Sequence, residues 1–344
     1  MTPKEIGSEY HSMPYGNGAG IDFPKVTDYV LTFSGRTAIE TVLKNEPHIK
    51  KALLPSYCCD SMIEPFRRAG IEVLFFSVFY DEKLQIDLII PDDIDCILWC
   101  NYFGFSHQMP DFGNFIRRGG IIIEDITHSF YSNIQYHEQS NYLVASLRKW
   151  EPIYCGGYCG SVSKVLKYKP KEEPPQSFLT EKRIIMERKS CYLEGKGNID
   201  KAQFLSDFSK SNAWLAVNYS GFRMDSASET YLQQVNQTKE KEQRIANAGR
   251  LYEQIRTNEF VNFMFDESDM DCPLFVPMII KKSFRDILRK ELTNRNIFCP
   301  IHWPHPIESC GSNLYDMELS LICDQRYTEK DMDYIATVIN SFAL

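Results

Sequence analysis

Short apolar segments alternate with amphipathic segments along the first half of the chain, and this alternation limits the possible folds more than any other feature. The apolar segments lie at residues 29–33, 51–55, 71–78, 96–105, 121–130 and 142–150. Between the first two, Ala38, Ile39, Val42 and Leu43 recur with helical spacing. Strands separated by helices at such short intervals form mainly parallel sheets covered on both faces. The sequence therefore predicts an α/β fold with a large, mainly parallel sheet between helices.

The pattern changes after about residue 165. A polar, proline-rich stretch at residues 167–177 predicts a surface loop. Residues 229–258 have the periodicity of one long amphipathic helix. Shorter strand and helix segments follow up to the last residue. We therefore predict a large domain over residues 1–235, of which 1–28 are irregular, and a smaller C-terminal α+β domain over residues 236–344.

The composition excludes several classes of partner. The 344 residues carry a formal net charge of −8, which is unsuited to nucleic acid or an anionic membrane surface. No apolar run approaches the roughly 18–20 residues that span a bilayer, and the N-terminus lacks the apolar core of a signal peptide. The 11 cysteines lie mostly in apolar runs, as reduced, buried thiols do. We predict a cytoplasmic protein without nucleic-acid or membrane partners.

Neither pair of neighbouring cysteines predicts chemistry. Cys155 and Cys159 lie four residues apart in a glycine-rich loop, but no second Cys/His pair follows at the spacing of a zinc site. Cys58 and Cys59 lie in an apolar turn after a strand, and no histidine–acid pair accompanies them. We therefore predict no metal and no cysteine nucleophile, and interpret Cys58 and Cys59 as packing residues.

Polar residues follow the expected strands at their carboxyl ends. In parallel sheets, ligands bind beyond these ends. The residues concerned are Ser34, Gly35, Tyr57, Asn101, Tyr102, Asp125 and Lys149. We expect the functional site among them.

The stretch Ser34-Gly35-Arg36-Thr37 stands where a helix begins. The free N–H groups and the positive end of the helix dipole could bind an anion there, with Gly35 allowing close approach and Thr37 adding a hydroxyl. Alternatively, Ser34 or Thr37 is only the helix cap. The stretch alone favours the cap.

Two further stretches carry ionisable groups. Asp125 ends a strand and His128 follows three residues later, as in a helix cap with an exposed histidine or as in a carboxylate that opposes a cationic ring nitrogen. Lys149 follows Ser146 and precedes two adjacent glycines. It is either a solvent-facing residue of a frayed strand or a desolvated amine with a lowered pKa, able to act as a nucleophile.

These groups together correspond to the requirements of pyridoxal 5′-phosphate (PLP). This cofactor needs a phosphate site, a carboxylate at its pyridine nitrogen and a lysine that forms a Schiff base. Asp125 would keep the nitrogen protonated, so that the ring accepts the electrons of a substrate carbanion. We therefore predict PLP as the cofactor.

The chain resembles the fold-type I PLP enzymes, and among them the DegT/DnrJ/EryC1/StrS sugar aminotransferases. The matching segments follow the family's order and extend over nearly the whole sequence. They are IGSEY, SGRTAIE, LPSYCCDSMIEPFRRAGIEVLFFSV, NYFGF, IIEDITHS, SLRKWEPIYCGG, FRMDSASETYL, CPIHWP and DQRYTEKDMDYIATVI. The resemblance implies a seven-stranded type of sheet in a large, cofactor-binding domain.

The resemblance also implies a role for each site residue. Lys149 would form the Schiff base and transfer the proton, Asp125 would pair with the ring nitrogen, and His128 would lie near the ring's 3-oxygen. The phosphate would be surrounded by Gly35, Arg36, Thr37 and Ser146. Stacking on the ring or lining of the substrate cleft would fall to Tyr57, Tyr102 and His302, and Trp303 would help His302 to close the site.

The chain departs from the family pattern at two places. Many members have an asparagine two residues before the arginine of the segment YSGFR, and it reaches the phosphate of the partner subunit. Here that position is Gly221, so that Arg223 or Asn218 replaces it or the contact is lost. The form SLRKW also differs from the commoner serine–aromatic–histidine form before the lysine.

The resemblance predicts an aminotransferase that works as a homodimer. The amino group would pass from an amino acid, glutamate in the first instance, to a keto group of a nucleotide-linked sugar in surface-polysaccharide or secondary-metabolite biosynthesis. Two alternatives remain. One is a PLP-dependent lyase or decarboxylase, since the same electron sink supports those reactions. The other is a PLP-fold protein that has lost its activity and serves as a sensor or scaffold.

Overall fold

The computed structural model describes residues 5–14, 16–106, 110–133, 138–306 and 311–342. Its large sheet has eight strands. In spatial order they are β2 (Asp28–Thr32), β9 (Gly157–Ser161), β8 (Tyr142–Ala145), β7 (Ile121–Asp125), β6 (Cys96–Cys100), β3 (Lys51–Pro55), β4 (Glu72–Asp81) and β5 (Lys83–Asp87).

The strand directions confirm the predicted, mainly parallel sheet. Strands β3, β4, β6, β7 and β8 pair in parallel, and β2 runs the same way because β9 is antiparallel to both β2 and β8. The eighth strand, β5, forms a hairpin with β4 and extends the predicted seven-stranded type of sheet at one edge. The central strands β6 and β7 are buried throughout, which explains their continuous apolar sequences.

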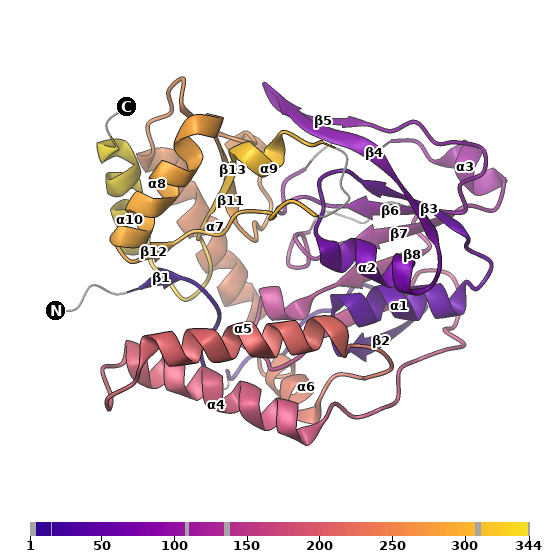
Figure 1. The fold of residues 1–344 in the computed structure, drawn as a ribbon, viewed down its shortest axis with the longest axis horizontal. Helices are drawn as coiled ribbons and strands as arrows, with labels where there is room; N and C mark the ends of the chain where they lie inside the picture. The colour runs from indigo at the N-terminus through magenta and orange to yellow at the C-terminus, as the bar shows by residue number, and fades with distance from the viewer. Residues whose placement is uncertain (1–4, 15, 107–109, 134–137, 307–310, 343–344) are drawn as a thin grey trace.

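Helices cover both faces of this sheet. Side chains alternate across a strand, so Tyr142 and Val144 of β8 join one hydrophobic core while Leu143 and Ala145 join another. The first core also takes apolar side chains of α1 (Gly35–Asn45), α2 (Asp60–Arg68) and α3 (Gly113–Arg117). The second takes those of α4 (Gln176–Leu193), α5 (Lys201–Val217) and α6 (Ser226–Leu232). Figure 1 shows α4 and α5 as a pair beneath the sheet.

The remaining elements form a smaller unit with its own core. Its sheet is antiparallel, in the order β10 (Val261–Phe263), β11 (Val276–Ile280) and β13 (Glu318–Leu321). The helices are α7 (Gln237–Gln254), α8 (Lys282–Asn294), α9 (Leu314–Met317) and α10 (Glu329–Ser341), with a 3-10 turn η2 (Glu267–Asp269). Strand β1 (Ile6–Gly7) pairs with β12 (Ile297–Phe298), so the start of the chain lies against this unit (Figure 1). The proposed boundary at residues 235/236 lies between α6 and α7.

The long helix predicted over residues 229–258 was wrong. The segment contains two helices, α6 and α7, with Gln233–Asn236 between them. The side chain of Asn236 accepts a hydrogen bond from the backbone of Lys239 at 3.2 Å and so begins the second helix. Such a cap satisfies free N–H groups of a new helix start, which the apolar periodicity alone does not reveal.

None of the helices within the described ranges is both long enough and apolar enough to cross a membrane.

Candidate functional site

The carboxyl ends of strands β2, β3, β6, β7 and β8 surround one pocket of about 310 Å³. Its lining includes six of the predicted site residues, namely Gly35, Arg36, Asp125, His128, Ser146 and Lys149. Four others, Thr37, Tyr57, Tyr102 and His302, are outside the lining. The structure thus brings together residues that are up to about a hundred positions apart in the sequence, because parallel strands end at the same edge.

The start of helix α1 supports both interpretations of its sequence. The Ser34 hydroxyl caps the helix by accepting the N–H of Thr37 at 3.3 Å. The Thr37 hydroxyl donates to the carbonyl of Tyr219 at 2.8 Å, away from the pocket lining. The N–H groups of Gly35 and Arg36 find no acceptor among the described residues. The cap therefore leaves two donors at the pocket.

Two glycines allow the backbone to close around this helix start. A Cβ on Gly35 would lie 3.3 Å from the Cβ of Ser146, so the helix start and Ser146 are in close contact. A Cβ on Gly157 would lie only 2.3 Å from the carbonyl oxygen of Ser34. Strand β9 can pack beside the start of α1 only because Gly157 has no side chain.

Asp125 presents a buried carboxyl group to the pocket. The residue is 7% exposed, and its Oδ1 accepts the N–H of Thr127 at 2.8 Å. Burial raises the pKa of Asp125, although hydrogen bonds from Thr127 and the charge of Lys149 act in the opposite direction. A cation at this carboxyl would lower its pKa again. Thr127, which the sequence analysis did not single out, also accepts the N–H of Ser146 through its hydroxyl at 3.0 Å.

His128 is a neutral hydrogen-bond donor at the pocket wall. Burial lowers its pKa well below the usual range, and the nearby His302 and Lys149 lower it further. Its Nδ1 accepts the N–H of Phe103 at 3.2 Å. Because Nδ1 accepts, the single proton of the neutral ring is on Nε2. The exposed histidine of the alternative interpretation is excluded, since His128 is 3% exposed.

Lys149 lies in the pocket but differs from the prediction in two respects. It ends a 3-10 turn, η1 (Leu147–Lys149), rather than a strand, because β8 stops at Ala145. Its side chain is exposed in the single chain, as in the solvent-facing alternative, whereas the PLP prediction depended on the desolvated amine. The turn takes the residue out of the sheet and places it at the mouth of the pocket, beside Asp125 and His128 in the lining.

The predicted aromatic residues form a layer behind the pocket. Tyr57 is fully buried, with its ring 5.6 Å from that of Tyr102 and 5.0 Å from that of Trp303. The lining contains Trp303, whose ring stacks on His128 at a centroid distance of 5.4 Å. His302 is also buried, and its ring lies 5.4 Å from that of His128. Of Tyr57, Tyr102, His302 and Trp303, only Trp303 thus lines the pocket.

Several lining residues were not among the predicted site residues. Arg148 is the most important, since it adds a second guanidinium to the pocket. The sequence does show Arg148 as a basic residue directly before the candidate lysine. Cys59 and Cys100 also belong to the lining, so Cys59 is not only a packing residue. Burial raises the pKa of both thiols.

Cys155 and Cys159 are both buried, Cys155 just before strand β9 and Cys159 within it. The thiol of Cys155 donates to Asp225 Oδ2 at 3.0 Å. Across the described part of the chain, no group of three or more histidine, cysteine or acidic side chains could hold a metal ion.

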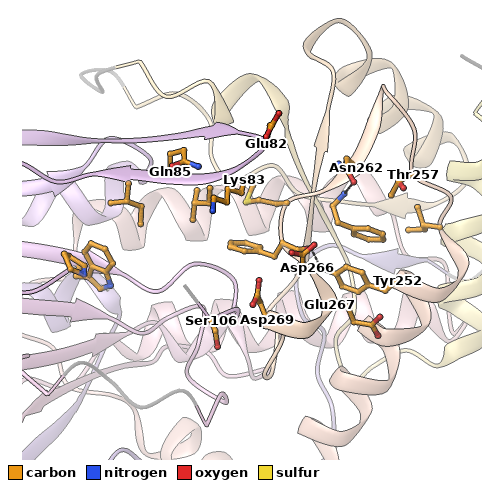
Figure 2. A pocket seen from close by; sticks show the side chains of 18 of the residues that line it. Glu82, Lys83, Gln85, Ser106, Tyr252, Thr257, Asn262, Asp266, Glu267 and Asp269 are labelled. Atoms are coloured by element: carbon orange, nitrogen blue, oxygen red, sulfur yellow. Dashed lines mark hydrogen bonds between the residues drawn. The ribbon is translucent and has the colours of Figure 1, made fainter. Parts of the chain in front are cut away.

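A larger cavity of about 800 Å³ lies elsewhere, between the β4–β5 hairpin and the segment that follows α7 (Figure 2). It shares no lining residue with the candidate site. Figure 2 shows Glu82, Asp266, Glu267 and Asp269 around it, with Lys83 as the cation among the lining residues. This acidic lining does not suit phosphates or carboxylates, so chemistry rather than size identifies the smaller pocket as the site.

No protein-family model matches the sequence, and no curated protein matches it significantly. Solved structures do match over most of the chain. The aminotransferase PseC of Helicobacter pylori, involved in pseudoaminic acid biosynthesis, superimposes with a TM-score of 0.66 at 14% identity, over 98% of each chain. A DegT DnrJ EryC1 StrS aminotransferase of Brucella abortus gives 0.63 at 16% identity, over 92% of this chain and 86% of that one. DesI, solved in the presence of its TDP-sugar product, gives 0.62 at 11% identity, over 92% and 80%. The chain therefore has the fold of these enzymes.

Proposed function

We propose that this chain, which has the fold of sugar aminotransferases, is itself a PLP-dependent aminotransferase. It would take the amino group of an amino acid, glutamate in the first instance, and transfer it to a keto group of a nucleotide-linked sugar. Such a product would enter surface-polysaccharide or secondary-metabolite biosynthesis. The class of acceptor is supported by the TDP-sugar in the DesI structure and by the sugar pathway named for PseC.

One observation carries the proposal: Lys149, Asp125 and His128 line the same pocket at the carboxyl edge of the sheet. The pocket is electrostatically suited to the cofactor. A buried carboxyl with a raised pKa faces it, which favours a cationic ring nitrogen at that place. A neutral imidazole with its proton on Nε2 provides a donor for a phenolic oxygen.

The start of helix α1 in the pocket lining suits a phosphate. The free N–H groups of Gly35 and Arg36 point out of the start of an 11-residue helix, where an anion is favoured. Ser146 adds a hydroxyl. Because Gly35 has no Cβ, Ser146 can lie close to the helix start. The residues present therefore fit both the ring and the phosphate of PLP.

Bound PLP would supply an electron sink for the electron pair released when the amino acid loses its α-proton. Within that chemistry, Lys149 Nζ would bind the cofactor covalently and later accept the α-proton and return it. Asp125 would hold a proton on the ring nitrogen, and His128 Nε2 would donate to the ring oxygen. Trp303, with Pro304, would exclude water from one side of the pocket.

We also propose that the protein forms a homodimer and is located in the cytoplasm. Lys149 lies at an open pocket mouth in the single chain, where a partner subunit would complete the enclosure. The free thiols of the ten described cysteines are compatible with a reducing compartment. Light scattering of the purified protein measures the oligomeric state directly.

The decisive test is a covalent bond between the cofactor and Lys149. The wild-type protein is mixed with PLP, reduced with borohydride and mapped by mass spectrometry. We expect the pyridoxyl mass on Lys149, its loss in Lys149→Ala, and its retention in Lys290→Ala, which removes an exposed lysine of α8. Modification of the alanine variant at another lysine, in equal yield, would refute the assignment.

Half-transamination separates the proposal from its alternatives. Wild-type protein loaded with PLP is mixed with glutamate in the absence of an acceptor. Conversion of PLP to pyridoxamine phosphate with release of 2-oxoglutarate is expected of an aminotransferase. Release of carbon dioxide or an elimination product would indicate a lyase or decarboxylase. Binding of PLP without turnover of any amino acid would indicate a sensor or scaffold.

A further inference from the structure

Two arginine side chains in the candidate pocket have no partner. Arg36, the second residue of α1, and Arg148, in the turn η1, both belong to the lining. The Nε atom of each is buried and without a hydrogen bond. Neither guanidinium forms a hydrogen bond or ion pair with any residue that the structure describes. Two guanidinium groups without a direct partner among the described residues thus line one small cavity.

Two other arginines with buried guanidinium groups have protein partners. Arg326 pairs with Asp324 at 2.7 Å, and Arg244 donates to the carbonyl of Leu274 at 3.3 Å while it covers the Trp150 ring. Such partners compensate the loss of hydration that burial imposes on a charge. Because Arg36 and Arg148 have no partner of this kind among the residues that the structure describes, the pocket is suited to an anion from outside the chain.

The two guanidinium groups act on each other. Burial lowers the pKa of Arg148, and the charge of Arg36 lowers it further, while Glu9 acts in the opposite direction. Glu9 compensates part of this charge but does not contact the guanidinium directly: its Oε1 accepts a hydrogen bond from Asn212 at 3.1 Å, and no ion pair joins it to Arg148. A ligand with two negative charges would relieve this repulsion.

The neighbouring groups match a phosphate. Gly35 and Arg36 offer their backbone N–H groups, and Ser146, two residues before Arg148, offers a hydroxyl. Lys149 lies at the same pocket, one residue after Arg148. A phosphoryl group held here would therefore belong to the molecule that reaches Lys149.

Arg223 and Asn218 could replace the asparagine that other family members extend to the partner subunit, but both have contacts elsewhere in this chain. Arg223 forms ion pairs with Glu173 and, at 3.3 Å, with Glu229. The Asn218 amide donates to the carbonyl of Trp214 at 2.9 Å. Gly221 has no side chain to offer. None of these three positions lines the pocket.

We propose that Arg36 and Arg148 form a cationic clamp, within a single subunit, for the phosphate of the cofactor. This inference rests on the proposed function and deepens it. The clamp takes over the contact that Gly221 cannot make, so the phosphate is held without a side chain of the partner subunit.

The test compares PLP with pyridoxal, which has the aldehyde and ring but no phosphate. Both are titrated into wild-type protein, Arg36→Met, Arg148→Met and the control Arg223→Met, with the dissociation constants read from absorbance. We expect each clamp variant to bind PLP about 10- to 100-fold more weakly, as for the loss of a charged hydrogen bond. Pyridoxal binding changes little, and the Arg223→Met control behaves like wild type in both titrations.

Inorganic phosphate gives a readout that does not need the cofactor. Calorimetry is expected to show phosphate binding to the wild-type protein and its loss in Arg148→Met. If the clamp variants keep the wild-type preference for PLP over pyridoxal, the clamp is refuted while the proposed function stands. If the wild-type protein takes up neither PLP nor pyridoxal but phosphate binding is lost in Arg148→Met, the proposed function fails and the anion site remains. Should Arg148→Met not fold, Arg148→Gln is measured in its place.

Discussion

Glu318 is a buried acid behind the candidate site, and its titration should be visible in the stability of the whole protein. It is 1% exposed and begins strand β13. Its carboxyl accepts the N–H of His302 at 2.5 Å and the hydroxyl of Ser320, and that hydroxyl also lies 2.7 Å from His302 Nδ1. His302 precedes Trp303, so this network supports the segment that closes the pocket.

The size of this effect on the free energy of unfolding follows from the pKa of Glu318. Burial raises it from 4.5 to about 8, against the hydrogen bonds and the Arg285 charge that lower it. Between pH 4.5 and about 8, Glu318 keeps its proton in the folded state but loses it in the unfolded state. The free energy of unfolding therefore falls as pH rises. The full contribution of the protonated Glu318 carboxyl to the free energy of unfolding is present below about pH 4.5 and is lost by about pH 8. With 1.36 kcal/mol per pH unit, the loss between pH 5.5 and 8 is about 3 kcal/mol.

The assay is denaturant unfolding of wild-type protein and Glu318→Gln across pH 5.5 to 8.5. Glutamine keeps the size and cannot ionise, and all other titrating groups are common to both proteins. We expect the wild type to lose about 3 kcal/mol relative to the variant over this range and to level off above pH 8. Parallel stability curves would show that Glu318 is ionised in the folded state throughout, and the argument from burial would fail.

Two further predictions concern the pocket walls. Asp125→Asn should slow half-transamination with glutamate by about 100-fold or more in stopped-flow measurements, because the amide cannot hold a proton on the ring nitrogen; an unchanged rate would remove Asp125 from the mechanism. Gly157→Ala should lower the free energy of unfolding by about 1–3 kcal/mol, because its Cβ would lie 2.3 Å from the Ser34 carbonyl oxygen. A fully stable alanine variant would show that β9 and the start of α1 are not so closely packed.

The sheet and the edge that carries the site could be predicted because they depend on local patterns. The buried strands β6 and β7 are continuous apolar runs, and the amphipathic periodicity between strands indicated helices such as α1. Once the strands were taken as parallel, Asp125 and Lys149 had to approach each other at their carboxyl ends. The long helix failed because the break at Asn236 depends on a single cap, which periodicity does not reveal.

The sequence by itself determined the α/β fold and a mainly parallel sheet, since strands that alternate with helices at short intervals form such sheets. Only the tertiary structure decided which side chains reach the candidate pocket. It placed Trp303 in the lining and Tyr57 behind it, and it committed the Thr37 hydroxyl to the Tyr219 carbonyl. It also left the Arg148 Nε without a hydrogen bond among the described residues. These outcomes depend on contacts between residues far apart in the chain, which no local pattern encodes.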